Sequence, residues 1–182
     1  MKKYNQDDKA MWVIRAGRAG ETDAAAHDIF ARKHLLVLES QKRDDLRKLP
    51  EERDSFYAAY RHTHPDDGDV AIRGIGGKFF RFIHEIKSGD IVLYPCRIDK
   101  LVYLGFVAGP YRYNAKEYPD FPHIRKVRWI GSFCKKKLSL GAFRELGGAR
   151  SLFLFKSHTS EVLKLISKLD PIAKPSITKG VI

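Results

Sequence analysis

Residues 74–95 read GIGGKFFRFIHEIKSGDIVLYP, and residues 101–109 read LVYLGFVAG after a short polar turn. Four apolar residues of the first stretch recur at helical spacing: Phe79, Phe82, Ile83 and Ile86. They predict an amphipathic helix, which the glycines lead into and which ends at Gly89. The apolar runs DIVLYPC and LVYLGFVAG then predict two strands joined by a short link, which favours an antiparallel sheet.

The regions on either side continue this pattern. Further strands are expected at residues 11–16, 35–39, 124–130 and 151–155, and further helices at 22–34, 50–62, 138–146 and from Ser157 or Thr159 onward. Short links between the middle strands favour an α+β fold, with a curled antiparallel sheet or small barrel flanked by helices. We expect a flexible lead-in at residues 1–10, one domain over residues 11–170, and a tail or linker at residues 171–182.

The chain is strongly basic. Its 182 residues include 34 Lys and Arg against 22 Asp and Glu, a formal net charge of +12. Such an excess predicts an anionic partner, nucleic acid first, because phosphates neutralised by Lys and Arg release counterions. The alternative is a charge that serves solubility alone. The candidate phosphate-binding residues are Arg15, Arg73, Lys78, Arg81, Arg112, Lys135, Lys136 and Lys137.

Several classes of protein are excluded by composition. There is no run of 18 apolar residues, so a transmembrane helix is not expected. The N-terminus lacks the apolar stretch of a secretory signal. Cys96 and Cys134 lie in no CxxC motif, which argues against a disulfide scaffold or a zinc ribbon. We therefore expect a reduced, cytoplasmic domain without a membrane partner, a metal or a cofactor.

The motifs give no convincing catalytic centre. GIGG lacks the third glycine of a dinucleotide fingerprint and the GK[ST] of a P-loop, although backbone amides at a helix start beside Arg73, Lys78 and Arg81 suit one phosphate. The loop with His62, His64, Asp66 and Asp67 is more typical of a solvated turn than of a metal site. Glu85 and Lys87 match the E-x-K of nucleases but fall on a predicted helix. We expect a non-catalytic domain.

Aromatic residues follow the predicted central strands, and most belong in a core. Tyr111 and Tyr113 differ, because they flank Arg112 just past Gly109-Pro110, where a strand is expected to leave the sheet. Aromatic faces stack on bases for about 1–3 kcal/mol, and an interleaved Arg adds a phosphate or cation–π contact.

Residues 11–156 resemble a known family. MWVIRAG, GGKFFRFIHEIKSGDIVLYP, LVYLGFVAGPYRY and YPDFPHIRKVRWIG are together similar to the EVE-like N-terminal domain of Mrr-type restriction endonucleases. That domain belongs to the PUA superfamily with the YTH and ASCH domains. The resemblance implies a PUA-like β-barrel and a pocket for one flipped, modified base of double-stranded DNA. It also implies a nuclease domain or subunit as partner.

The resemblance also implies which residues line the base pocket. They are Gly17 and Arg18 after the first strand, Glu39, Ser40 and Gln41 after the second, Tyr111 and Tyr113, with Trp12 and Tyr94 flanking. Glu39 or Gln41 would accept from an exocyclic amine and Ser40 would donate or accept. Related domains place a tryptophan at the end of the second strand, whereas this chain reads LLVLESQ. The aromatic wall of the pocket that this tryptophan forms is therefore missing, or it is supplied by Tyr60 or Trp129.

Three other functions fit the same residues. An RNA-binding PUA-type domain shares the fold and the charge. An enzyme acting on nucleic acid is disfavoured by the lack of an acid, base, nucleophile or metal set. The third alternative is a protein-interaction module in a defence complex, for which the net positive charge would have no role in binding.

Overall fold

The computed structural model describes residues 9–15, 21–38, 45–148 and 150–169. One six-stranded sheet has the order β2-β5-β4-β3-β1-β6. Its strands are β1 (Met11–Ile14), β2 (Leu35–Leu38), β3 (Ile91–Pro95), β4 (Leu101–Tyr113), β5 (His123–Cys134) and β6 (Leu152–Leu154). The α-helices are α1 (Glu21–Lys33), α2 (Arg53–Thr63), α3 (Asp69–Phe80), α4 (Leu140–Leu146) and α5 (Thr159–Leu165). Shorter helical turns are η2 (Leu46–Lys48), η3 (Arg81–Glu85), η4 (Lys135–Lys137) and η5 (Ile166–Lys168). The α+β class is confirmed, and no described helix has the length and apolarity needed to cross a membrane.

The sheet is mixed and open. β1 pairs in parallel with β3, Trp12 lying opposite Val92, while the other pairs are antiparallel. β2 and β6 form the two edges, so among the described residues the sheet does not close into a barrel. The expectation of a wholly antiparallel sheet was wrong, because β1 pairs with a strand far along the chain rather than with its nearest neighbour in sequence.

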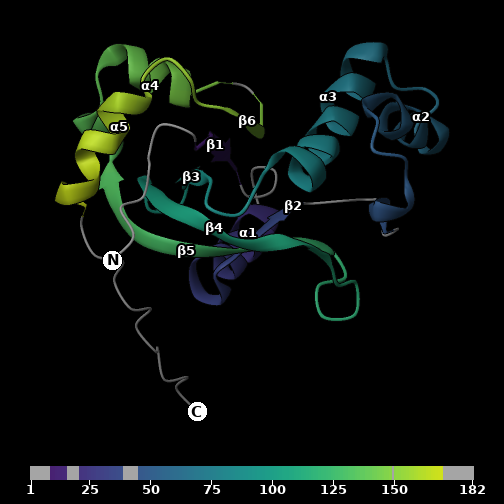
Figure 1. Cartoon of the computed structure of the whole chain (residues 1–182), viewed down its shortest axis with the longest axis horizontal. Coiled ribbons are helices and arrows are strands. Elements are labelled where there is room, and N and C mark those ends of the chain that lie inside the picture. The colour runs from purple at the N-terminus through teal and green to yellow at the C-terminus, as the bar shows by residue number, and fades with distance from the viewer. Residues whose placement is uncertain (1–8, 16–20, 39–44, 149, 170–182) are drawn as a thin grey trace.

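Helices cover both faces of the sheet (Figure 1). Successive side chains of a strand point to opposite faces, and β1 divides accordingly. Met11 and Val13 pack into a cluster with Ala142 of α4 and Val162 of α5. Trp12 and Ile14 belong to the other cluster, which includes Phe30 of α1 and residues of α2 and α3. All residues of β1 are therefore buried.

β4 and β5 form the long hairpin that organises the sheet. Their pairing shifts register between Leu104 and Gly105 and again between Val107 and Tyr111. Such irregularities bend a strand and increase its twist. β4 continues to Tyr113, past the predicted end at residue 109, so Tyr111 and Tyr113 lie within the hairpin and not beyond it.

The glycines of GIGG lie inside a helix. α3 begins at Asp69, so Gly74–Gly77 occupy its middle and not its start. A Cβ on Gly76 would come within 2.9 Å of the Tyr57 ring and 3.0 Å of the Phe56 carbonyl oxygen on α2. Gly76 therefore allows α2 and α3 to pack closely. The predicted phosphate site at a helix start beside Arg73, Lys78 and Arg81 was wrong for this reason.

A buried arginine joins the end of α3 to the sheet. The Arg125 side chain on β5 is 3% exposed. Its guanidinium donates to the carbonyl oxygens of Phe82 at 2.7 Å, Ile83 at 2.8 Å and Gly109 at 3.3 Å. Phe82 and Ile83 lie in η3, a π-helical turn. Arg125 thus satisfies carbonyl groups that the irregular turn leaves available.

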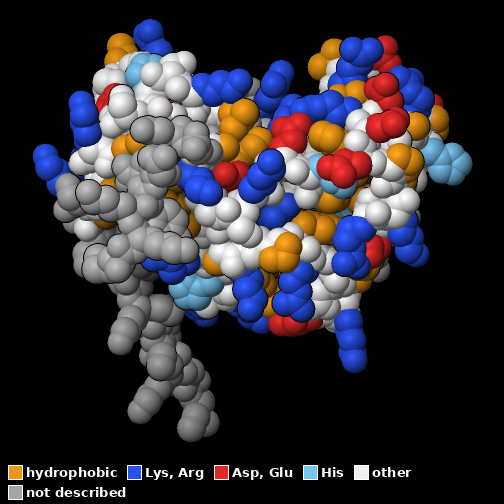
Figure 2. Space-filling model, viewed as in Figure 1, with side chains coloured by type: hydrophobic (Ala, Val, Ile, Leu, Met, Phe, Trp, Pro, Cys, Tyr) orange, Lys and Arg blue, Asp and Glu red, His pale blue; other side chains and the backbone are white. Residues whose placement is uncertain are grey.

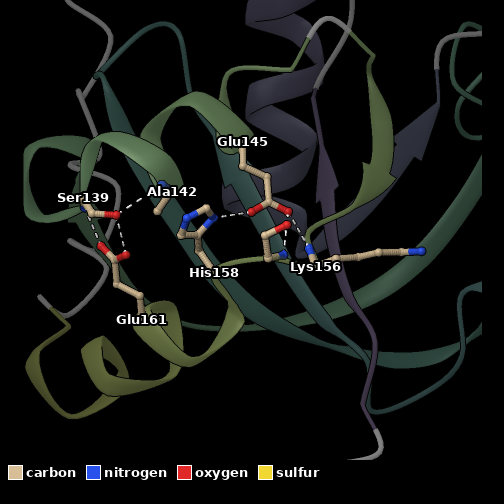
Figure 3. Close-up of polar contacts among 7 residues, drawn as sticks. Ser139, Ala142, Glu145, Lys156, His158 and Glu161 are labelled. Carbon is tan, nitrogen blue, oxygen red and sulfur yellow. Dashed lines mark hydrogen bonds and ion pairs between the residues drawn. The ribbon is translucent and has the colours of Figure 1, made fainter.

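A polar clamp holds α4 against the start of α5 (Figure 3). The Glu145 carboxylate accepts from the backbone amides of Lys156 at 2.6 Å and Ser157 at 3.0 Å. Its second oxygen lies 2.7 Å from Nδ1 of His158. Burial alone would raise the pKa of Glu145, but these hydrogen bonds outweigh it and lower the pKa below its ordinary value. The ionised carboxylate therefore stabilises this part of the fold.

The clamp predicts a loss of stability in acid. Because the folded pKa of Glu145 is lowered, its contribution is fully present above the ordinary value of 4.5 and is lost as pH falls through the folded pKa. Glu145→Gln should lower the free energy of unfolding at pH 7 by about 1–2 kcal/mol. Urea titrations at pH 7 and pH 3 measure this, and the difference between variant and wild type should shrink at pH 3. An equal difference at both pH values would contradict the assignment.

Candidate nucleic-acid interface

Arg15 lies at the end of β1, in a group of cations. Its guanidinium donates to the Leu146 carbonyl oxygen at 3.1 Å, which fixes the side chain. Burial, and then the charge of Arg97, lower the pKa of Arg15. Burial also lowers the pKa of Lys135, followed by the charges of Arg15 and Lys100. These cations converge because β1, β3 and β5 run in the same direction and end on the same side of the sheet.

A second group of cations surrounds Arg81 at the start of η3. Burial, and then the charge of Arg53, lower the pKa of Arg81, and Arg150 adds to the effect. Glu85 acts in the opposite direction and forms an ion pair with Arg53. Three guanidinium groups and the Glu85 carboxylate thus gather here.

The two groups are neighbours in the fold. The Arg15 amide donates to the Ser151 carbonyl oxygen at 2.9 Å, and Arg150, which acts on Arg81, directly precedes Ser151. We call the combined set the basic belt; its members are Arg15, Arg53, Arg81, Arg97, Lys100, Lys135 and Arg150. In Figure 2, Lys and Arg side chains gather along the upper margin between the region of α4 and α5 and that of α2 and α3.

The belt is suited to binding anions. Partly buried cations that repel one another lower each other's pKa, and an anion placed among them relieves both the repulsion and the desolvation. Guanidinium groups also bind phosphate oxygens in a bidentate manner. The geometry therefore favours a polyanion that contacts several belt residues at once.

The belt includes some of the predicted phosphate-binding residues. Arg15, Arg81 and Lys135 belong to it, and Lys136 and Lys137 follow Lys135 in η4. Arg73 is exposed on α3, and the half-buried Lys78 places its ammonium 5.2 Å from the Phe79 ring centroid. Arg112 lies near the far end of β4, opposite the end where Lys100 and Lys135 lie. The structure thus does not bring all these residues together.

Two residues expected to flank the base pocket lie in the core. Trp12 and Tyr94 are each 2% exposed. The Trp12 indole donates to the Asp90 carboxylate at 2.9 Å. The Tyr94 ring lies 4.6 Å from that of Phe30, measured between centroids. A base cannot stack on faces that are already packed, so both act as core residues in this structure.

Tyr111 and Tyr113 both lie against a buried histidine. Tyr111 is 9% exposed, and its hydroxyl lies 2.7 Å from Nδ1 of His123. Burial is the main cause that raises the pKa of Tyr111. Tyr113 is half-buried, and its ring lies 5.6 Å from that of His123. Of the two, Tyr113 retains the greater exposure.

Five predicted pocket residues lie outside the described residues: Gly17, Arg18, Glu39, Ser40 and Gln41. They follow β1 and β2, and these two strands have β3, β4 and β5 between them in the sheet. Of the two substitutes for the missing tryptophan, Trp129 is buried and donates to the Phe30 carbonyl oxygen at 2.7 Å. Tyr60 stacks on His64 and donates to Asp67 at 2.8 Å.

Comparison with known proteins adds a family. A family model described as a domain of unknown function (DUF8426) matches residues 12–145, more than half of the chain. The chain belongs to the DUF8426 family. No curated protein and no solved structure matches it. The DUF8426 region extends from β1 into α4 and contains every belt residue except Arg150.

Sequence reasoning missed four belt residues of this DUF8426 chain: Arg53, Arg97, Lys100 and Arg150. None lies in a basic run or a regular pattern. Arg97 and Lys100 lie in the polar turn between β3 and β4, which was interpreted as a link alone. Only the order of the strands shows that this turn meets the end of β1.

Proposed function

We propose that this DUF8426 chain is a non-catalytic nucleic-acid-binding domain whose basic belt holds the phosphate backbone. The observation that carries the proposal is the grouping of the belt cations from separate segments of the chain, with Glu85 as the acidic group acting on Arg81. Phosphate contacts supply affinity and orientation but little sequence information. The net charge of +12 would draw a polyanion to the domain from a distance.

The finer proposal is a reader of modified DNA. Its support is the resemblance of residues 11–156 to the EVE-like domain of Mrr-type restriction endonucleases, whose fold is PUA-like. The two register shifts in the β4–β5 hairpin bend its strands, which is compatible with a curled sheet, while the described sheet stays open. In this proposal a base is extruded at a cost of a few kcal/mol. It is held beside the end of β2, near Tyr113, because β1 runs antiparallel to β2 and ends at the opposite end of the sheet. A nuclease domain or subunit would act on the DNA so marked.

A binding screen tests both levels of the proposal. Matched duplexes would carry methylated cytosine, hydroxymethylated cytosine, methylated adenine or no modification, with an RNA duplex of the same sequence alongside. We expect all DNA duplexes to bind at low salt and one modification to bind more tightly. An apolar pocket wall distinguishes a methyl group by about 1–3 kcal/mol, so the preference should be about 10-fold to 100-fold. Equal affinity for all duplexes would overturn the reader proposal, and tighter binding of RNA would replace DNA as the target.

Tyr113 is the described aromatic best suited to contact an extruded base. It is half-buried at the end of β4. His123 of β5 pairs with Tyr113 on one side and with Leu38, the last residue of β2, on the other, so Tyr113 lies one strand away from the end of β2. Tyr113→Ala should weaken binding of the preferred modified duplex by about tenfold, and of the unmodified duplex by much less. Fluorescence anisotropy with both duplexes measures this. Equal losses on both would assign Tyr113 to general packing, and Tyr111→Phe serves as the control that keeps the ring.

A further inference from the structure

Three metal-ligating side chains meet at one end of the basic belt. His27 comes from α1, and Cys96 and Asp99 come from the end of β3 and the turn after it. Their ligand atoms all lie within 4.8 Å of one another. His27 and Cys96 are 69 positions apart in the sequence, so the fold and not a local motif assembles the group. The His62–Asp67 loop, considered from the sequence, does not form such a group among the described residues.

The spacing of the Cys96 sulfur and the His27 nitrogen fits tetrahedral coordination. Sγ of Cys96 lies 3.5 Å from Nδ1 of His27. In a tetrahedral zinc site with Zn–S near 2.3 Å and Zn–N near 2.05 Å, the sulfur and nitrogen are about 3.6 Å apart. Thiolate, imidazole and carboxylate are also the ligands that zinc takes in proteins.

We propose that His27, Cys96 and Asp99 form a zinc site, with water as the fourth ligand. The Cys96 sulfur lies within hydrogen-bond distance of Nδ1 of His27. On binding, the metal takes the place of the Cys96 thiol proton, which leaves to solvent, and no electrons are transferred. Thiolate and carboxylate together balance the two charges of the ion, so the site stays neutral beside Arg97 and Lys135. Asp99 is exposed, which leaves a path for the ion.

The hydroxyl groups of two tyrosines contact the proposed ligands. The Tyr103 hydroxyl donates to the Asp99 carboxylate at 2.5 Å. The Tyr94 hydroxyl lies 3.0 Å from Nδ1 of His27 and is also within reach of the Cys96 sulfur. When Nδ1 binds the metal, the Tyr94 hydrogen turns to the thiolate. Partners of this kind orient metal ligands.

The site would join two parts of the fold. α1 is connected to β1 through residues 16–20 and packs under the sheet through Phe30. A metal bridging α1 to the turn at 97–100 fixes the helix against the part of the belt formed by Arg97 and Lys100. We therefore assign the site a structural role at the interface, independent of whether the belt binds nucleic acid.

Cobalt binding tests the site. Titration of the reduced, metal-free chain with Co²⁺ should produce a thiolate-to-cobalt charge-transfer band and the visible absorption of tetrahedral cobalt. Both signals should saturate at one equivalent of Co²⁺. Added Zn²⁺ should displace the cobalt and remove both signals. Cys96→Ser should abolish the charge-transfer band, and Asp99→Asn should lower Co²⁺ affinity by at least tenfold. Cys134→Ser, the other cysteine, is the matched control and should behave as wild type. Circular dichroism establishes that each variant is folded.

Three results would overturn the zinc site: no charge-transfer band in the wild type, a band that survives Cys96→Ser, or a band that disappears in Cys134→Ser. If Cys96→Ser fails to fold, the test of the site is Asp99→Asn, because Asp99 is exposed and its substitution leaves the core intact. Unchanged Co²⁺ affinity in that variant would contradict the ligand set.

Discussion

Replacing Arg97 and Arg150 together by glutamate is expected to weaken binding of duplex DNA by roughly 100-fold at low salt. Both side chains are exposed, and they lie in the two groups of cations that make up the basic belt. The slope of log affinity against log salt changes by about 0.9 for each phosphate that the protein neutralises. Loss of two phosphate contacts should therefore make the slope shallower by about 2. Anisotropy titrations over a range of NaCl concentrations measure both quantities.

The matched control is a double reversal away from both the basic belt and Tyr113. Lys164 on α5 and Lys168 in η5 are exposed, and these helices pack in the core cluster of Met11 and Val13, whereas Tyr113 packs against the other cluster. Lys164→Glu with Lys168→Glu changes the net charge by the same amount. We expect it to weaken binding by less than about tenfold, through long-range attraction alone. Similar losses in the two double variants would show that net charge, and not the belt, governs binding.

Arg125→Met is expected to lower the free energy of unfolding by about 2–4 kcal/mol. The substitution retains an apolar stem of similar length but removes the donors to the Phe82 and Ile83 carbonyl oxygens. Each buried carbonyl left without a donor costs about 1–3 kcal/mol. Arg125→Lys should be intermediate, because a single ammonium cannot reproduce the fork of donors. Urea unfolding measures the midpoint and the slope.

Arg128→Met on the same strand is the control for Arg125. Arg128 is exposed and lies 5.2 Å from the Phe106 ring centroid, a contact of about 0.5–1 kcal/mol. Its removal should therefore change stability by less than about 1 kcal/mol. If Arg125→Met were as stable as Arg128→Met, the carbonyls of η3 would have found other donors and the linking role of Arg125 would be wrong.

The sequence predicted local elements well, because each has its own apolar pattern. Residues 35–39 and 151–155 were expected as strands, and the structure has β2 and β6 there. It did not predict the parallel pairing of β1 with β3, which joins residues far apart in the chain, such as Met11 and Ile91. No local pattern encodes such a pairing, and the belt and the proposed zinc site both depend on it or on similar distant contacts.

Two misinterpretations have specific physical causes. The glycines of GIGG were expected to lead into a helix, and glycine weakens helix interiors. They lie within α3, where the contact of Gly76 with α2 leaves no room for a side chain. The buried position of Arg125 was not predicted. Its place two and four residues before the buried Val127 and Trp129 put it on the inward face, and this alternation was the available signal.

The most direct test of the central claim is the salt dependence of wild-type binding to a modified DNA duplex. With roughly three to seven belt cations contacting phosphates, log affinity should fall linearly with log salt at a slope between about −3 and −6. The reversal of Arg97 and Arg150 should make this slope shallower. Absence of binding at low salt, or an affinity that does not change with salt, would contradict a nucleic-acid interface at the basic belt.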